Sequence, residues 1–337
     1  MGKRAVSSVT RVILGSNMIA CMIFGFVTPG LAQTYPTQPI TLVVGMAPGG
    51  ITDVATRTIA NEAKKDLGVE LLVVNKPGAM QTVAMSYVIS SRPDGYTFGA
   101  TTDAPYVRAP HMLNLNFSPQ TETIPIIYYG SFPAVVIVKV DSPFKTFKDV
   151  IQFARENPGK LTYGTPGVAS GPDLGIGGFA LQMGLKIPMV PYTGDSEALL
   201  SLLGGQIMMA GMGIGSCMSQ VKAGKVRILA VIHGDERLET FPDVPTLNEF
   251  GFKDILPLPG LGLFGPKGLP DPIVKKIEAA FKKASQSAEF KTFAANNYVY
   301  PMKKGSTGLE LRSYLATASQ TTGNLIQRLG LGPSKPK

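Results

Sequence analysis

Residues 40–53 read ITLVVGMAPGGITD, an apolar run that leads into a glycine turn. A continuous apolar run bounded by proline and glycine is typical of a strand that is covered on both faces of its sheet. From 55 to 67 an apolar residue recurs at every fourth position, which predicts a helix that Gly68 can end. The stretch therefore predicts one βα unit with a tight turn at the end of its strand.

The same alternation continues along the chain. Apolar runs at 69–74 and 96–101 predict two more strands, and residues 83–88 predict the helix between them. Strands and helices that alternate with short connections are typical of a parallel, doubly wound sheet. The long apolar segment at 126–140 is broken by Pro133, which predicts strands that cross into a second unit.

A second series of strands and helices follows from 147 to 232, and the apolar run at 261–264 predicts a strand that returns to the first unit. We therefore predict an α/β protein of two doubly wound lobes joined by a hinge, with a ligand cleft between the lobes. The predicted parts are 1–32 as a signal peptide, 33–132 with 261–337 as the first lobe, and 133–260 as the second lobe.

The start of the chain has the pattern of an export signal. Three basic residues precede an apolar run at 12–27, and Gly30-Leu31-Ala32 follows it. This order is typical of a secretory signal peptide, so we expect cleavage after Ala32. Two alternatives remain open, which are an uncleaved membrane anchor and a lipid anchor at Cys21.

Composition excludes several classes of protein. The 337 residues are 44% hydrophobic and 16% charged, which is typical of a globular chain. The net charge of +9 becomes +9 − 3 = +6 without the signal peptide, and these charges form no basic run. Nucleic acid is therefore not an expected partner. Cys217 is the only cysteine beyond the predicted signal peptide, and a packing role is expected for it.

Three loops at predicted strand ends are candidates for ligand binding. In 48–53 the glycines allow close backbone approach, the start of the next helix favours an anion, and the Thr52 hydroxyl can cap the helix or donate to a carboxylate. The loop at 75–79 leaves the neighbouring strand, and the small-residue loop at 163–171 is its counterpart in the second lobe. An ordinary capped turn also explains the first loop, and a flexible surface loop also explains the third.

No pattern points to catalysis. His111 and His233 have no metal-like spacing, so both are expected to be structural or surface residues. The chain has no Gly-x-Ser-x-Gly elbow and no cysteine cluster. We therefore expect neither a metal nor another cofactor.

In order along residues 35–330, the chain resembles the substrate-binding proteins of tripartite tricarboxylate transporters. The motifs that carry the resemblance are Tyr35-Pro36-x-x-Pro39-Ile40, Gly49-Gly50-x-Thr52-Asp53, Asn75-Lys76-Pro77-Gly78-Ala79, Pro93-Asp94-Gly95-Tyr96-Thr97, Asn157-Pro158-Gly159-Lys160-Leu161, Val190-Pro191-Tyr192, Leu203-Gly204-Gly205 and Pro242-Asp243-Val244-Pro245-Thr246. The resemblance implies a periplasmic binding protein fold of a type II-like kind, with a hinge and no catalysis. It implies a monomer in the periplasm that delivers a small organic acid to membrane subunits of a transporter.

The resemblance also implies which residues contact the ligand. Backbone amides and hydroxyls of the first-lobe loops would bind one carboxylate, and the second-lobe loop would close over the other end. The residues at these positions are Gly50, Ile51, Thr52, Gly78, Ala79, Met80, Thr102, Thr165, Gly167, Ser170 and Asp195.

This chain departs from the family pattern in ways that affect the expected ligand. Met80-Gln81 stands where relatives usually have two glycines, and Met208 and Met212 replace aspartates. These residues predict a more apolar pocket and a partly apolar acid rather than citrate. Two other functions stay open on the sequence, which are a sensor that docks on a membrane receptor and, with less support, a periplasmic hydrolase.

Overall fold

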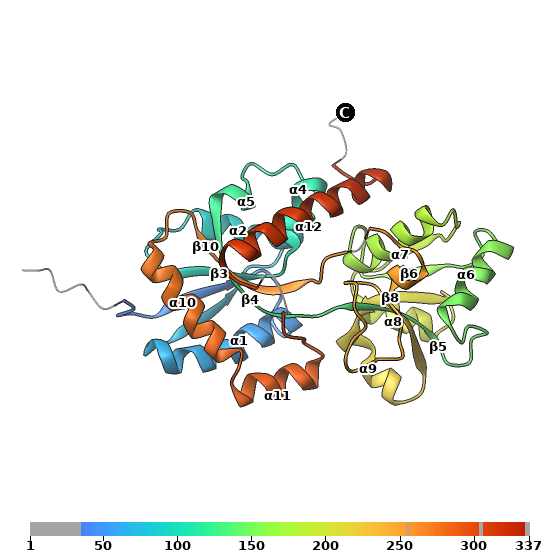
Figure 1. The fold of residues 1–337 in the computed structure, drawn as a ribbon, viewed down its shortest axis with the longest axis horizontal. Helices are drawn as coiled ribbons and strands as arrows, with labels where there is room; N and C mark the ends of the chain where they lie inside the picture. The colour runs from blue at the N-terminus through green and yellow to red at the C-terminus, as the bar shows by residue number, and fades with distance from the viewer. Residues whose placement is uncertain (1–34, 255, 303–305, 334–337) are drawn as a thin grey trace, which may run out of the picture. The chain divides into compact units, whose positions relative to one another are not determined.

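The computed structural model describes residues 35–254, 256–302 and 306–333 (Figure 1). These residues form two five-stranded sheets that are flanked by helices. The predicted signal peptide and Cys21 lie outside the described residues. Within the described part, no helix is long and apolar enough to cross a membrane.

The first sheet has the strand order β2-β1-β3-β10-β4. Its strands are β1 (Ile40–Val44), β2 (Leu71–Asn75), β3 (Thr97–Thr101), β4 (Thr123–Ser131) and β10 (Gly260–Pro266). β1 is parallel to β2 and β3, and Val44 pairs with Asn75 on one side and with Ala100 on the other. The three loops that leave these strands therefore start at the same edge of the sheet.

Helices flank the first sheet. They are α1 (Ile51–Leu67), the 3₁₀ turn η1 (Ala79–Gln81), α2 (Thr82–Ile89), α3 (Ala104–Val107), α4 (Ala109–Met112), α5 (Pro119–Glu122), α10 (Asp271–Ala284), α11 (Ala288–Asn297) and α12 (Gly308–Arg328). α1 packs on α10 and α11, while α12 packs on α3 and β4. The predicted helix at 55–67 starts four residues earlier, at Ile51, because Gly50 occupies its N-cap in an extended conformation.

The second sheet has the strand order β7-β6-β8-β5-β9. Its strands are β5 (Ala134–Lys139), β6 (Tyr163–Thr165), β7 (Met189–Pro191), β8 (Met209–Gly213) and β9 (Val226–Val231). Its helices are α6 (Phe147–Glu156), α7 (Gly171–Gln182), α8 (Asp195–Leu203), α9 (Ile214–Lys222) and the 3₁₀ turn η2 (Leu247–Phe250). β6 is parallel to β7 and β8, so their loops again share one edge.

The two crossings occur where the apolar pattern predicts them. β4 continues into β5 past Pro133, and β10 returns the chain to the first sheet (Figure 1). The predicted α/β fold of two doubly wound lobes is thus confirmed. Neither sheet is purely parallel. In the first sheet β10 runs antiparallel to β3 and β4. In the second sheet β5 runs antiparallel to β8 and β9. The residue boundaries of the lobes stay a prediction.

Packing of the second lobe explains its lone thiol. Cys217 is fully buried in a cluster with Val135, Met212 and Ile214, and its Sγ donates to the Ile214 carbonyl. Burial and the neighbouring Asp195 carboxylate raise the pKa of the Cys217 thiol to about 12. The thiol is therefore a packing group, as the sequence predicts.

The returning strand depends on two glycines under one tyrosine ring. Tyr128 of β4 is 2% exposed, and its ring lies over Gly260 and Gly262 of β10. A Cβ on Gly262 would lie 2.4 Å from Cε1 of Tyr128, and one on Gly260 would lie 2.3 Å from Cδ2. Only glycine leaves the ring this space, so the second crossing is packed directly against the first.

We expect Gly262→Ala to lower the free energy of unfolding by about 1–3 kcal/mol, because the added methyl group overpacks a rigid ring. Urea unfolding followed by far-UV circular dichroism measures the change. Gly194→Ala is the matched control, since a Cβ there meets nothing within 4 Å and its φ of 178° is extended. Equal stability of the two variants would contradict this account of the Tyr128 packing.

Candidate ligand-binding site

The loop after β1 is shaped by its own polar groups. Gly49 has a φ of 83°, its amide donates to Oδ2 of Asp53 over 2.9 Å, and the Gly50 amide donates to the Ala47 carbonyl over 3.3 Å. The Gly50 amide is therefore used within the turn. The amides of Ile51 and Thr52 occupy the first turn of α1, where no carbonyl of the helix can accept them.

Thr52 is the candidate ligand contact of this loop, because its hydroxyl has no hydrogen-bond partner among the described residues. The residue is 1% exposed, and its hydroxyl has no hydrogen bond with any residue that the structure describes. Thr52 Oγ1 is not among the fully enclosed side-chain oxygens that lack a partner, so this hydroxyl is open to a ligand or to water. The Thr52 side chain does not cap α1, so the simple capping role is not what the structure shows.

An ion-pair brace connects the first two loops. The Asp53 carboxylate accepts hydrogen bonds from Nε of Arg57 over 3.1 Å and from Nδ2 of Asn75 over 2.8 Å. Asn75 also donates to the Met46 carbonyl over 2.9 Å. Burial raises the pKa of Asp53, but the hydrogen bonds from Arg57, Gly49 and Asn75 outweigh it and lower the pKa overall. The charged carboxylate thus holds the end of β1 against the end of β2.

The second loop has an unusual backbone. Ala79, Met80 and Gln81 have φ values of 42°, 54° and 68°, which L-residues rarely adopt. The Gln81 side chain turns inward, where its Oε1 accepts from the Thr102 amide over 2.9 Å and its Nε2 donates to the Thr102 hydroxyl over 2.7 Å. This double hydrogen bond compensates for the backbone strain. Gly45 makes room for it, since a Cβ there would lie 2.6 Å from Cβ of Gln81.

The position of Gln81 changes one expectation about the pocket. Gln81 is 6% exposed and its side chain bonds Thr102, so this side chain does not project into the space in front of the loop. The Thr102 hydroxyl accepts from Gln81 and from the Ala104 amide, which leaves its hydrogen for another acceptor.

Met212 and Met208 pack in the hydrophobic clusters of the second lobe. The two methionines therefore give no reason to expect an apolar pocket.

The loop after β6 is held by Asp173 of α7. Oδ2 of Asp173 accepts from the Ala169 amide and Oδ1 accepts from the Tyr163 hydroxyl, both over 2.8 Å. Ser170 caps α7 by accepting from the Asp173 amide, and the Thr165 hydroxyl donates to the Gly167 carbonyl. Burial raises the pKa of Asp173. This loop is preformed rather than loose.

Asp195 is engaged within its own lobe. Its Oδ2 accepts from the Gly213 amide over 3.2 Å and from the Ser216 hydroxyl over 2.6 Å, which ties α8 to the start of α9. Burial raises the pKa of Asp195. The predicted site residues thus fall into a first-lobe group and a second-lobe group, each at one sheet edge. A direct contact of any of them with a ligand stays a prediction.

Four residues that shape these edges are not among the predicted ligand-binding residues. Asn75 and Gln81 brace the first-lobe loops, as described above, and Arg108 and His233 lie where the two lobes meet. His233 is 5% exposed, which agrees with a structural role, and His111 bonds the Ser319 hydroxyl of α12 over 3.0 Å. The two hydrogen bonds of Gln81 had no sequence signal, because any polar side chain at 81 fits the same pattern.

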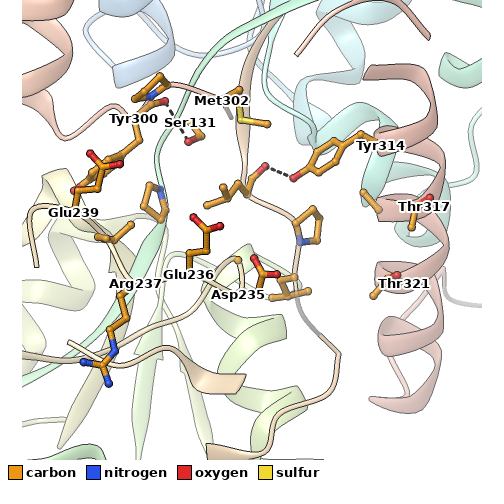
Figure 2. Close-up of a pocket in the computed structure, with 18 residues that line it drawn as sticks. Ser131, Asp235, Glu236, Arg237, Glu239, Tyr300, Met302, Tyr314, Thr317 and Thr321 are labelled. Carbon is orange, nitrogen blue, oxygen red and sulfur yellow. Dashed lines mark hydrogen bonds between the residues drawn. The ribbon is translucent and has the colours of Figure 1, made fainter. Parts of the chain in front are cut away.

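A separate cavity of about 360 Å³ lies at the two crossings, away from the predicted site residues. Figure 2 shows Asp235, Glu236 and Glu239 on one side of it and Thr317 and Thr321 of α12 on the other. The Tyr314 hydroxyl donates to the Leu258 carbonyl over 3.2 Å within it. Since both crossings line this space, it belongs to the hinge, and none of the predicted ligand-binding residues lines it.

A two-lobed α/β fold with donor-rich loops at the strand ends is typical of solute-binding proteins. Residues 55–331 match the family described as the tripartite tricarboxylate transporter family receptor. A UPF0065 protein of Bordetella pertussis is 35% identical over 303 residues, which are 90% of this chain and 93% of that protein. The chain belongs to the tripartite tricarboxylate transporter receptor family.

Solved structures agree with this assignment. A TctC solute binding protein from Polaromonas, solved without ligand, has a TM-score of 0.76 and 28% identity, with 88% of this chain and 100% of that chain covered. An R. palustris protein solved with adipate has a TM-score of 0.76 at 24% identity, with 89% and 100% covered, and shows the shared fold.

We expect Asp53→Asn to lower the free energy of unfolding at pH 7 by about 1–3 kcal/mol, because it removes the charge that Arg57 and Asn75 bind. The pKa of Asp53 is lower in the folded protein, so its contribution is complete at neutral pH and is lost as the pH falls through that folded value. The difference between wild type and variant should therefore shrink below pH 4, which urea unfolding at several pH values measures.

Asp141→Asn is the control for this experiment, since the Asp141 side chain is 75% exposed and surface ion pairs contribute little. A stability difference for Asp53→Asn that is the same at pH 7 and pH 3 would show that the charge of Asp53 is not what holds the loops.

Proposed function

We propose that this receptor captures a small organic acid in the cleft between its lobes, in the periplasm, and delivers it to the membrane subunits of a tripartite tricarboxylate-type transporter. The observation that carries the proposal is the hydroxyl of Thr52, which has no partner among the described residues, beside the orphan amides of Ile51 and Thr52. These three donors belong to the first turn of α1 and have no acceptor among the described residues. A carboxylate supplies the acceptors that they lack.

Electrostatics at the start of α1 supports an anionic ligand. The positive end of the helix dipole points at the loop, and Asp53 is neutralised by Arg57 through a 3.0 Å ion pair. The Thr102 hydroxyl, fixed by Gln81, adds a further donor at the same sheet edge. The brace of Asp53 and Asn75 and the Gln81–Thr102 pair position these donors before any ligand arrives, which lowers the entropic cost of binding.

The second lobe completes the site in this proposal. Its loop at Thr165–Ser170 is preformed by Asp173, so the lobes can close as rigid bodies about the two crossings. The hinge cavity between the crossings provides space for that motion. Membership of the receptor family supports delivery of the captured acid to a transporter.

We expect Thr52→Val to weaken binding of a carboxylate by about tenfold or more, because a hydrogen bond to a charged group contributes roughly 1.5–3 kcal/mol. A thermal-shift screen of mono-, di- and tricarboxylates identifies the acid, and isothermal titration measures its affinity. Thr58→Val is the matched control on the same helix, since the Thr58 hydroxyl bonds the Val54 carbonyl and lies far along α1. Unchanged affinity in Thr52→Val would remove Thr52 from the site.

Closure of the lobes is a separate expectation. Small-angle scattering with and without a saturating carboxylate from the screen should show a smaller radius of gyration in the bound protein, because the second-lobe loop reaches the ligand only when the lobes approach. The Thr52→Val variant at the same acid concentration, below its own saturation, should show a smaller change. An unchanged radius at saturation would refute hinge closure.

A further inference from the structure

The β2 strand forms an open edge of the first sheet. Its inner side pairs with β1, and among the described residues no strand pairs with its outer side. The backbone groups of Glu70 and Lys76 hydrogen-bond β1, so the even-numbered residues of β2 direct their backbone toward β1. The N–H and C=O groups at 71, 73 and 75 therefore point away from the sheet, where another strand can pair with them.

The other sheet edges of the described part are better protected. β4 is bridged along its outer side by Tyr300 and Thr307. β7 has only three residues and ends in Pro191. Most of β9 is buried, and Val231 at its end is bridged to Thr246. Proteins usually protect the edges of their sheets in these ways, which β2 lacks.

One face of this open edge is apolar and exposed. Leu72 is 51% exposed and Val74 is 43% exposed. Val74 pairs with Val43 of β1, and Val43 packs against Ala84 and Val88 of α2. Leu72 and Val74 therefore lie on the sheet face that α2 covers, beyond the reach of that helix.

The exposed side of α2 extends this apolar surface. Val83 and Tyr87 lie one turn apart on α2 and are 47% and 49% exposed. Nζ of Lys76 lies 4.5 Å from the centroid of the Tyr87 ring, so this side of α2 is turned toward β2. We call Leu72, Val74, Val83 and Tyr87 the edge patch. A contiguous exposed apolar patch is typical of an interaction surface.

The edge patch is complementary to a second copy of itself. Glu70 and Lys76 are equally distant along the chain from Val73, on either side of it. In an antiparallel pair of β2 strands centred on Val73, Glu70 lies opposite Lys76 of the second copy and Leu72 lies opposite Val74. These are the non-hydrogen-bonded pairs, in which side chains are closest, while the outward groups at 71, 73 and 75 form the hydrogen-bonded pairs. One register thus satisfies the backbone, the apolar side chains and the charges.

Neither charged residue is held away from this contact. The Glu70 side chain is 65% exposed, and its 3.4 Å ion pair with Lys64 is a surface pair that contributes little. Strand alternation places Glu70 on the same face as Leu72, and the contact with Tyr87 places Lys76 there too.

We propose that two copies of this chain form a two-fold homodimer in which their β2 strands pair antiparallel about Val73 and join the two first sheets into one continuous sheet. The symmetry uses every contact twice. Because the strands are antiparallel, the loops at 75–79 of the two copies point in opposite directions. The dimer does not rest on the proposed function, and it differs from the monomer that the family resemblance implies.

Sedimentation velocity over a series of protein concentrations tests the apolar contact. We expect wild type to form dimers at micromolar concentration. Leu72→Lys should raise the dimer dissociation constant at least about tenfold, because each copy loses an apolar side chain at the interface. Leu200→Lys is the matched control, since Leu200 of α8 is 69% exposed and lies outside the edge patch, and it should change the constant by less than about threefold.

Charge reversal tests the register. Glu70→Lys and Lys76→Glu each place like charges opposite one another in the dimer, so each should raise the dissociation constant about three- to tenfold at low ionic strength. The double variant carrying both substitutions restores opposite charges and should return the constant to within about twofold of wild type. A purely local effect of either substitution predicts no such rescue.

Wild type that stays monomeric throughout the concentration series would overturn the inference. A dimer that Leu72→Lys leaves unchanged, or that Leu200→Lys weakens equally, would show that the edge patch is not the interface. A double variant that dimerises no better than the single ones would overturn the register about Val73. Far-UV circular dichroism shows that each variant is folded, and the charge reversals keep the test intact if Leu72→Lys is not.

Discussion

The carboxylate of Asp53 makes the interactions on which the loop edge of the first lobe depends. It accepts from the Gly49 amide, from Arg57 and from Asn75, so one side chain closes the glycine turn, pairs with the charge of Arg57 and fastens β2 to β1. A low-dielectric environment strengthens each of these hydrogen bonds. The turn at Gly49 and Gly50 is therefore held by Asp53, and no side chain within the turn has to stabilise it. The loop can therefore present bare backbone to a ligand.

In the second loop too, side-chain hydrogen bonds offset an unfavourable backbone conformation. Three consecutive left-handed residues would be unfavourable alone, yet the Gln81–Thr102 pair holds them and fastens β3 to the loop after β2. Gly45 has to be small for this pair to form. The three parallel strand ends are thus connected laterally by Asn75 and Gln81, and the site is a property of the whole edge rather than of one loop.

Sequence patterns predicted the lobes, the crossings and the ligand loops because apolar periodicity and glycine turns are local signals. An apolar run alone would begin two strands too early, since Leu161 and Ile207 are buried in the core two residues before β6 and β8 begin. Burial does not require strand pairing. The antiparallel direction of β10 and the approach of Arg108 to Gly171 join segments far apart in the chain, and no local pattern reports such contacts.

The buried thiol of Cys217 has a practical consequence for anyone who wishes to watch this receptor move. With its pKa near 12 and no exposure, it stays protonated and unreactive toward maleimide dyes at neutral pH. It is the only cysteine after Cys21. A cysteine introduced on each lobe can therefore be labelled without removing the native one, so single-molecule energy transfer can follow the distance between the lobes in an otherwise unaltered protein.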